Sequence, residues 1–427
     1  MRKNNSKKLL KLIFIVSLLS ILFISYASAS SINDTNPSIT NDNQNNNTNY
    51  QTTSEITSNN NSKTQSKNTT IETNDKISNK QITNNTYNNQ LNNYISENST
   101  KSNSNNYNIY VNSISGSDTN PGTEYQPYKT LKYAVNKSNK YSSIFLYDGT
   151  YTLTDSITIS HDLNITGQSR TNTIIDSNYK TAFILYNTAF NIKNLKITNG
   201  YGTYGGAIKI KINSILNVDN VIFENTKGTI GGVIGNVATN INITITNSIF
   251  RNNNASNLGG AISNTGVYGI TIINNCNFTN NQVTGFNAST NKGSGGAIYI
   301  GNEATAYINN TRFENNTAYR GGAIYNSNGL QAIYNNLTCI NNIAYGTNIS
   351  NAYGGALMIA SGQTTVTNSY YFNNSAINGG AISINSGLPV LISNTTYDTQ
   401  YNTIEEITIE EEIKPLDLIY EEFIMEE

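Results

Sequence analysis

The sequence predicts an all-β fold, a single-stranded right-handed parallel β-helix of about 10–11 coils. Three observations lead to this prediction. One phrase, an aromatic residue, then Asn, then Gly-Gly-Ala-Ile, recurs along the chain, as in Arg312–Tyr325. Its Gly-Gly pairs return at intervals of 25–36 residues, with room for three short β segments in each copy. The segments are rich in Ile, Thr and Tyr and are separated by turns rather than helices, which is typical of a β solenoid.

Residues 1–29 have the pattern of a secretory signal. Five basic residues precede an apolar run from Leu12 to Ile24, and Ala27-Ser28-Ala29 supplies a cleavage site. The run is shorter than the roughly 20 residues that span a bilayer. We therefore expect a secreted or cell-surface protein with no transmembrane segment in the mature chain.

Residues 30–106 consist mainly of Asn, Thr, Ser, Gln and Lys, without a sustained apolar period. Such a segment buries too little apolar area to fold, so we expect disorder. It serves as a spacer, as a glycan-bearing tail, or only as low-complexity sequence. N-x-[ST] sequons are frequent throughout the chain, for example at Asn164, Asn242 and Asn309, but they do not show glycosylation.

Residues 107–402 form the predicted β-helix, and 107–140 form its N-terminal cap. A strand and a turn region precede an amphipathic stretch from Tyr128 to Val135 that suits a short helix. Solenoids need such caps because a terminal repeat would otherwise expose its core.

Asparagine accounts for 78 of the 427 residues and holds a fixed register in the repeats. It stands three residues before and two residues after the aromatic position, for example around Phe250, Phe278 and Phe313. Coils stack about 4.8 Å apart, so equivalent Asn side chains can bond along the axis, and Asn tolerates the left-handed backbone of a corner. The predicted structural ladder comprises Asn199, Asn225, Asn252, Asn280, Asn315, Asn341 and Asn373.

The Gly-Gly pairs provide a second bend in each coil, and the apolar residue two positions after each pair forms an inward column. Cys276 and Cys339 also fall on inward positions, two coils apart. That separation exceeds the reach of a disulfide, so we expect buried free thiols. The inward column comprises Ile208, Ile234, Ile262, Ile298, Ile324, Leu357 and Ile382.

Composition excludes several functions. The formal net charge is −1, and removal of the five basic residues of the signal leaves about −6, which argues against a nucleic-acid partner. No spacing of Cys or His indicates a metal site, and no motif indicates a cofactor. Between Gly200 and Gly387 carboxylates are few and scattered, so we expect no catalytic residues and predict that the protein is not an enzyme.

The pairing of Gly-Gly-Ala-Ile with Phe-x-x-Asn, as in Phe250 to Asn253 and Phe313 to Asn316, resembles the repeats of chlamydial polymorphic outer-membrane proteins. The order of signal, Asn-rich lead and solenoid is similar to adhesin-like proteins of gut methanogenic archaea. The resemblance covers roughly residues 107–400 and implies a pectin-lyase-like β-helix with a role in cell adhesion. The sequence departs from both families at 403–427, a Glu-rich segment that is either an acidic end cap or a frameshifted or truncated end.

Two surfaces are candidates for ligand binding. The repeat is lengthened at one corner by two insertions, after Phe278 and after Cys339, and insertions on one face of a solenoid often build its binding surface. A second candidate is a stacked platform of Tyr299 and Tyr325 on an outward column. Both places also have a purely structural interpretation: the corner aromatics cover their own loops, and the two tyrosines form a cross-strand pair that stabilises the sheet. The corner candidates are Phe286, Tyr319, Arg320, Tyr345 and Tyr353.

The sequence thus predicts an adhesin-like protein, secreted or at the cell surface, whose partners are host or microbial surface glycans or proteins. A carbohydrate-active enzyme, either a polysaccharide lyase or a glycoside hydrolase, and a non-binding structural component of the envelope are the alternatives.

Overall fold

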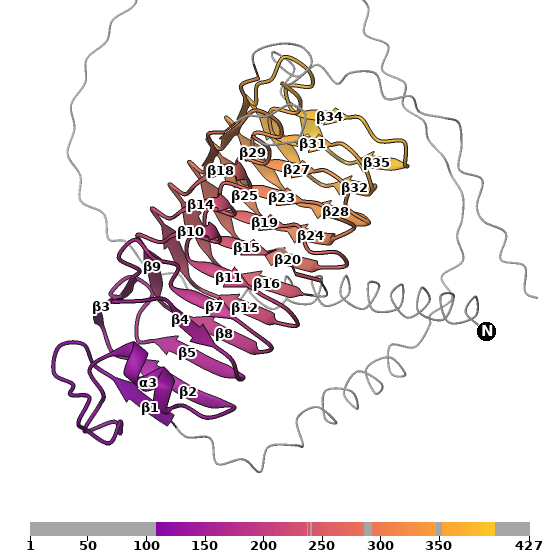
Figure 1. The fold of residues 1–427 in the computed structure, drawn as a ribbon. Coiled ribbons are helices and arrows are strands. Elements are labelled where there is room, and N and C mark those ends of the chain that lie inside the picture. The colour runs from indigo at the N-terminus through magenta and orange to yellow at the C-terminus, as the bar shows by residue number, and fades with distance from the viewer. Residues whose placement is uncertain (1–107, 237, 240, 286–292, 347–351, 398–427) are drawn as a thin grey trace, which may run out of the picture. The chain divides into compact units, whose positions relative to one another are not determined.

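The computed structural model describes residues 108–236, 238–239, 241–285, 293–346 and 352–397, which form a right-handed parallel β-helix (Figure 1). The predicted fold class is confirmed. Four parallel sheets, here called A to D, run along the stack of coils. The predicted signal at 1–29, the segment 30–106 and the acidic segment 403–427 lie outside the described residues.

Sheet A has eleven strands within the described residues, and their spatial order is their order in the chain. Each successive coil therefore adds one strand to the growing edge of the sheet. Its strands are β1 Asn108–Val111, β2 Ser142–Leu146, β5 Leu163–Gly167, β8 Ala189–Lys193, β12 Ile215–Asp219, β16 Asn242–Thr246, β20 Ile270–Asn274, β24 Thr305–Asn309, β28 Gln331–Asn335, β32 Gln363–Thr367 and β35 Val390–Ser393.

Sheets B, C and D complete each turn of the chain. Sheet B consists of β3 Gly149–Thr152, β6 Thr173–Asp176, β9 Lys196–Thr198, β13 Ile222–Glu224, β17 Ile249–Arg251, β21 Asn277–Thr279, β25 Arg312–Glu314, β29 Thr338–Ile340, β33 Tyr370–Phe372 and β36 Thr396–Tyr397. Sheet C consists of β4 Ile157–Ile159, β7 Phe183–Leu185, β11 Ile208–Ile210, β15 Ile234–Asn236, β19 Ile262–Asn264, β23 Ile298–Ile300, β27 Ile324–Asn326, β31 Leu357–Ile359 and β34 Ile382–Ile384. Sheet D, at the corner, consists of β10 Tyr201–Tyr204, β14 Lys227–Ile230, β18 Asn254–Leu258, β22 Gln282–Val283, β26 Thr317–Ala318 and β30 Ile343–Ala344.

A short helix, α3 Leu131–Lys137, lies between β1 and β2. It starts three residues later than the predicted stretch because Thr130 is its N-cap: the Thr130 side chain accepts a hydrogen bond from the Tyr133 amide. Leu131, Ala134 and Val135 are buried, so the apolar stripe faces the core as the pattern indicates.

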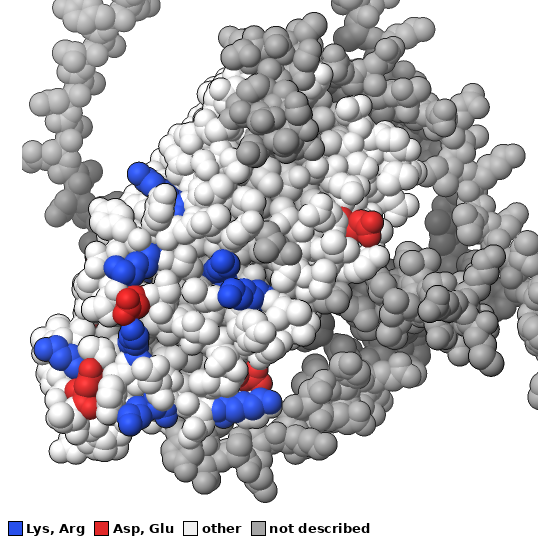
Figure 2. Space-filling model, in the orientation of Figure 1, with Lys and Arg blue, Asp and Glu red and all other residues white. Residues whose placement is uncertain are grey.

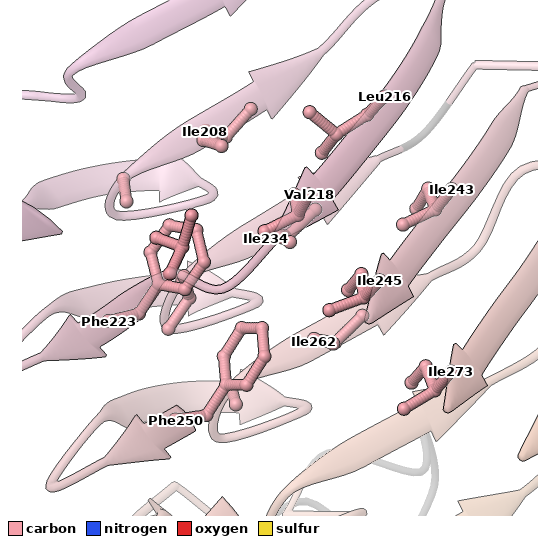
Figure 3. Close-up of a cluster of buried hydrophobic side chains, with 14 of the residues drawn as sticks. Ile208, Leu216, Val218, Phe223, Ile234, Ile243, Ile245, Phe250, Ile262 and Ile273 are labelled. Carbon is pink, nitrogen blue, oxygen red and sulfur yellow. The ribbon is translucent and has the colours of Figure 1, made fainter. Parts of the chain in front are cut away.

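The core is built from columns of equivalent residues. The predicted column from Ile208 to Ile382 is in register from coil to coil, and every member is at most 1% exposed. Figure 3 shows Ile208, Ile234 and Ile262 of this column in one buried cluster with Phe223 and Phe250 of sheet B. Phe223, Phe250, Phe278 and Phe313 stack there with ring centroids 4.6–5.0 Å apart. Each buried ring contributes roughly 2–3 kcal/mol of hydrophobic stabilisation.

The aromatic column changes character in the last coils. Register places Cys339 beside Phe313, followed by Tyr371 and Tyr397. The hydroxyls of Tyr334, Tyr371 and Tyr397 are buried and have no hydrogen-bond partner among the described residues. Burial raises the pKa of the Tyr371 hydroxyl far above its ordinary value.

Both cysteines are buried and free, as predicted. Burial raises the pKa of the Cys276 thiol to about 12. No helix in the described part of the chain has the length and apolar character needed to span a membrane.

The corners use the left-handed backbone that the sequence indicates. All seven residues of the predicted Asn ladder have φ between 50° and 57°. The leading glycine of every Gly-Gly pair has φ between 58° and 72°. Side-chain hydrogen bonds join Asn280 to Asn252 and Asn373 to Asn341. The Asn199 side chain instead donates a hydrogen bond to the Asp176 carboxylate.

A buried ladder runs one residue later than the predicted one. Asn281 donates to Asn316 Oδ1 (3.0 Å), and Asn316 donates to Asn342 Oδ1 (2.9 Å). The same Asn316 amide also donates to the carbonyl of Phe278, so its polar atoms are satisfied inside the protein. The members, all 0% exposed, are Asn253, Asn281, Asn316, Asn342 and Asn374.

Candidate functional site

The predicted corner site is described in part. Phe286 and the second insertion around residues 347–351 lie outside the described residues. The backbone amides of Tyr319 and Arg320 both donate to the carbonyl of Gly293. The Tyr345 ring lies 4.5 Å from that of Tyr319, and its hydroxyl donates to the Val283 carbonyl at 2.6 Å. Burial raises the pKa of Tyr345 to about 12. The structure therefore brings two predicted rings together, and the Tyr345 hydroxyl is anchored to β22, which lies two strands from β30 in sheet D.

The proposed Tyr299–Tyr325 platform is not exposed. The rings stack in parallel with centroids 5.6 Å apart, but the residues are only 7% and 3% exposed. Met358 continues their column, and Leu258, Tyr353 and Ala360 pack against it. These residues form a second apolar cluster outside sheet C, so a sugar ring has no access to the two tyrosine faces. The prediction of an exposed platform was wrong because side chains from neighbouring segments cover this part of the sheet.

An open hollow of about 390 Å³ lies on the outer face of sheet A over β2, β5, β8, β12 and β16. Its floor contains three asparagines in register on successive strands, which we call the amide strip: Asn164, Asn191 and Asn217. Asn191 donates to Asn164 Oδ1 at 2.6 Å, and Asn217 donates to Asn191 Oδ1 at 2.7 Å. These bonds hold the amide planes in a fixed, regular arrangement that faces solvent.

Charged side chains flank the amide strip. Lys193 and Asp219 are exposed, occupy paired positions on β8 and β12, and line the hollow. Asp219 Oδ1 accepts hydrogen bonds from Thr246 Oγ1 and Asn247 Nδ2, both at 2.7 Å. The hollow therefore offers amides, hydroxyls, one cation and one oriented carboxylate.

This site was not predicted from the sequence. Its signal is an outward Asn at matching register positions of three strands that are adjacent in sheet A, β5, β8 and β12. The high Asn content of the chain hides this signal.

Charge is distributed unevenly. In Figure 2 most coloured side chains lie over the N-terminal coils. After Asn252, the charged residues within the described part of the chain are Glu303, Arg312, Glu314 and Arg320. The described residues carry 14 basic and 10 acidic side chains, so the β-helix is positively charged although the whole chain has a formal charge of −1. Within that part no group of three His, Cys, Asp or Glu residues is placed to hold a metal ion.

A partly buried cluster of charged side chains lies on the outer face of sheet B. The Glu224 side chain is 13% exposed, with Lys196 Nζ 3.0 Å from Oε1 and Arg251 Nε 2.7 Å from Oε2. Burial raises the pKa of Glu224, but the hydrogen bonds from Arg251 and Lys196 outweigh it and hold this pKa below its usual value.

We expect Glu224 to make stability depend on pH at the acid end. A depressed folded-state pKa contributes stability above the unfolded-state value of about 4.3, and this contribution disappears as the pH falls through the folded-state value. Glu224→Gln should therefore flatten the loss of stability below about pH 4, measured by urea unfolding across a pH series. Glu314→Gln is the matched control. Glu314 forms an ion pair with Arg312 on its own strand, whereas Glu224 pairs with cations on the two neighbouring strands. Equal flattening in both variants would contradict the assignment.

No family model and no curated protein matches the chain. Solved structures with a similar fold include a rhamnogalacturonan lyase (14% identity, 70% of this chain and 89% of that chain, TM-score 0.39). They also include a PL6 family alginate lyase (15% identity, 68% of this chain and 39% of that chain, TM-score 0.41). A third is a GH136 lacto-N-biosidase from Eubacterium ramulus (12% identity, 75% of this chain and 70% of that chain, TM-score 0.37).

At these identities the likeness shows the fold alone. The neighbours nevertheless contradict the prediction that the protein is not an enzyme, because they are polysaccharide lyases and a glycoside hydrolase. That prediction had rested on the few, scattered carboxylates of the repeats. The chain shares the parallel β-helix fold with these carbohydrate-active proteins.

Proposed function

We propose that this protein binds an acidic polysaccharide in the hollow on the outer face of sheet A. The observation that supports the proposal is the amide strip of Asn164, Asn191 and Asn217, which is preorganised, open to solvent and flanked by Lys193. The buried Tyr299–Tyr325 pair offers no such access.

The chemistry of the hollow suits a carbohydrate chain. Amide and hydroxyl groups both donate and accept hydrogen bonds, as sugar hydroxyls require. The groups repeat about every 4.8 Å along the stack, which suits a ligand that is itself a regular polymer. Lys193 supplies a charge-assisted contact for a sugar carboxylate, and the positive charge of the β-helix attracts a polyanion.

Two roles are compatible with such binding. The first is adhesion: a secreted or surface-displayed, adhesin-like protein would hold host or microbial glycans in the hollow. The second is catalysis, because Lys193 and Asp219 place a basic and an acidic group on neighbouring strands, as lyase or hydrolase chemistry on a polysaccharide needs.

We expect the full chain to bind alginate or polygalacturonate, both acidic, more tightly than neutral hydroxyethyl cellulose. Lys193→Gln should weaken binding about tenfold, since it removes one charge-assisted hydrogen bond. Asn191→Val should also weaken it by interrupting the amide strip. Titration calorimetry measures the affinities, and binding of the wild-type protein should decrease with added salt.

The matched control is Asn335→Val. Asn335 also donates to an outward Asn on the neighbouring strand of sheet A, Asn309, but it does not line the hollow. Its substitution should leave binding unchanged. New reducing ends or unsaturated products would identify an enzyme, whereas binding without them would favour an adhesin. Absence of binding to all three polymers would contradict the proposal and leave a structural envelope component.

A further inference from the structure

Three aromatic rings continue the outer face of sheet A beyond the hollow. Tyr110 on β1 and Phe145 on β2 are paired in register, and Tyr147 follows two residues after Phe145. Ring centroids lie 5.9 Å apart for Tyr110 and Phe145, 5.3 Å for Phe145 and Tyr147, and 6.3 Å for Tyr110 and Tyr147. We call these three rings the aromatic patch.

The aromatic patch is continuous with the hollow. Phe145 is the register partner of Thr166, and Thr166 lines the hollow. Ser143, two residues before Phe145 on the same strand, also lines the hollow and receives a hydrogen bond from Asn164. Along this face the outward residues therefore change from aromatic on β1 and β2 to amide and hydroxyl on β5, and then to the charged pair on β8 and β12.

Tyr147 is anchored to the surrounding backbone, and the other two rings pack against it. The Tyr147 amide donates to the Val111 carbonyl at 3.0 Å, and the Tyr147 hydroxyl donates to the Glu124 carbonyl at 3.4 Å. The Tyr151 hydroxyl bonds both the Val111 and the Tyr147 carbonyls, at 2.8 and 2.7 Å, which ties the two segments together. All three rings remain partly exposed on the outer face. A ligand would therefore meet preformed rings, with little ordering needed on binding.

We infer that the aromatic patch is a sugar-stacking subsite at the N-terminal end of the hollow. The inference rests on the function proposed above and names which part of the ligand binds where. The apolar C–H face of a sugar ring packs on the aromatic patch, while its neighbours along the polymer bond the amide strip. The site thus extends from β1 to β16, and a long oligosaccharide gains a contact that a short one cannot reach.

The test compares alginate oligosaccharides of increasing length by titration calorimetry on the full chain. Phe145→Val removes the ring but places a β-branched residue, which strands favour, at this position; it should weaken binding of the longest oligosaccharides about tenfold and leave the shortest unchanged. Phe145→Tyr keeps a ring and should restore the wild-type length dependence. Phe372→Val is the matched control, because Phe372 also faces outward beside another ring, Tyr370, but on sheet B.

Each outcome is decisive. If the wild-type protein binds and Lys193→Gln weakens it, yet Phe145→Val binds every length as the wild type does, the subsite is overturned and the hollow stands. A uniform loss at all lengths in Phe145→Val, with an unchanged melting temperature, also overturns the length-dependent subsite. If the wild-type protein binds no oligosaccharide, the proposed function itself fails.

Discussion

Gly322→Ala is expected to destabilise the β-helix by about 4 kcal/mol or more, because no side chain fits at this position. A Cβ at Gly322 would overlap the carbonyl oxygen of Gly355 in the next coil and lie 2.6 Å from the amide nitrogen of Ile343. Both are backbone atoms of residues whose amides donate hydrogen bonds to a neighbouring coil, Ile343 to Asn316 and Gly355 to Gly379, so neither can yield locally. Thermal unfolding followed by circular dichroism measures the effect.

Gly387→Ala is the control for this substitution. No heavy atom lies within 4 Å of a Cβ at Gly387, so the same chemical change should be close to neutral. Similar melting temperatures for both variants would show that the coils separate easily, contrary to the close stacking in the structure. Replacing glycine by alanine also reduces the conformational entropy of the unfolded chain, but this effect is the same in both variants and cannot account for a difference between them.

Asn316→Ala is the second large effect that we expect, with a loss of about 3 kcal/mol in the free energy of unfolding. The substitution leaves the backbone and side-chain amides of Asn281 without their acceptor, and the Phe278 carbonyl without its donor. Each buried polar group that loses its hydrogen-bond partner costs about 1–3 kcal/mol of stability. Water that enters the space left by the smaller alanine side chain replaces only some of these hydrogen bonds. Urea unfolding gives the difference.

The matched control for Asn316→Ala is its neighbour in the chain. Asn315 is exposed and sits at φ 54°, which glycine adopts readily, so Asn315→Gly should change stability by less than about 1 kcal/mol. Equal losses in the two variants would mean that the corner backbone, rather than the buried ladder, determines stability here.

The sequence was sufficient to predict the register of the fold. A periodic Asn at the corners and a periodic Ile after Gly-Gly specify where each coil turns and which side chains face inward. The same pattern did not identify the buried ladder, because Asn occupies both the second and the third position after the aromatic residue. The left-handed corner at Asn315 turns the chain so that Asn316, not Asn315, points inward. That direction depends on the backbone path, which composition does not reveal.

The candidate site was less accessible to sequence reasoning. Whether Tyr299 and Tyr325 are exposed depends on segments from other coils, since Met358 and Tyr353 are distant in the chain. The hollow depends on outward residues that make no contribution to the core pattern. Alternation predicts that Asn164, Asn191 and Asn217 point outward, but only the stacking of the coils brings them into one bonded row.

The aromatic column changes from phenylalanine to cysteine and tyrosine along the stack, so the two ends of the solenoid differ in stability. In a stack of coils, stability is approximately the sum of terms between neighbours. The coils with Tyr334, Tyr371 and Tyr397 enclose phenol groups that water would solvate better, so opening them recovers hydration that the all-phenylalanine coils cannot recover. We therefore expect unfolding to start at the last described coils and to proceed toward the N-terminus. The hollow and the aromatic patch lie at the opposite end, so a ligand-binding surface would persist after the last coils have come apart.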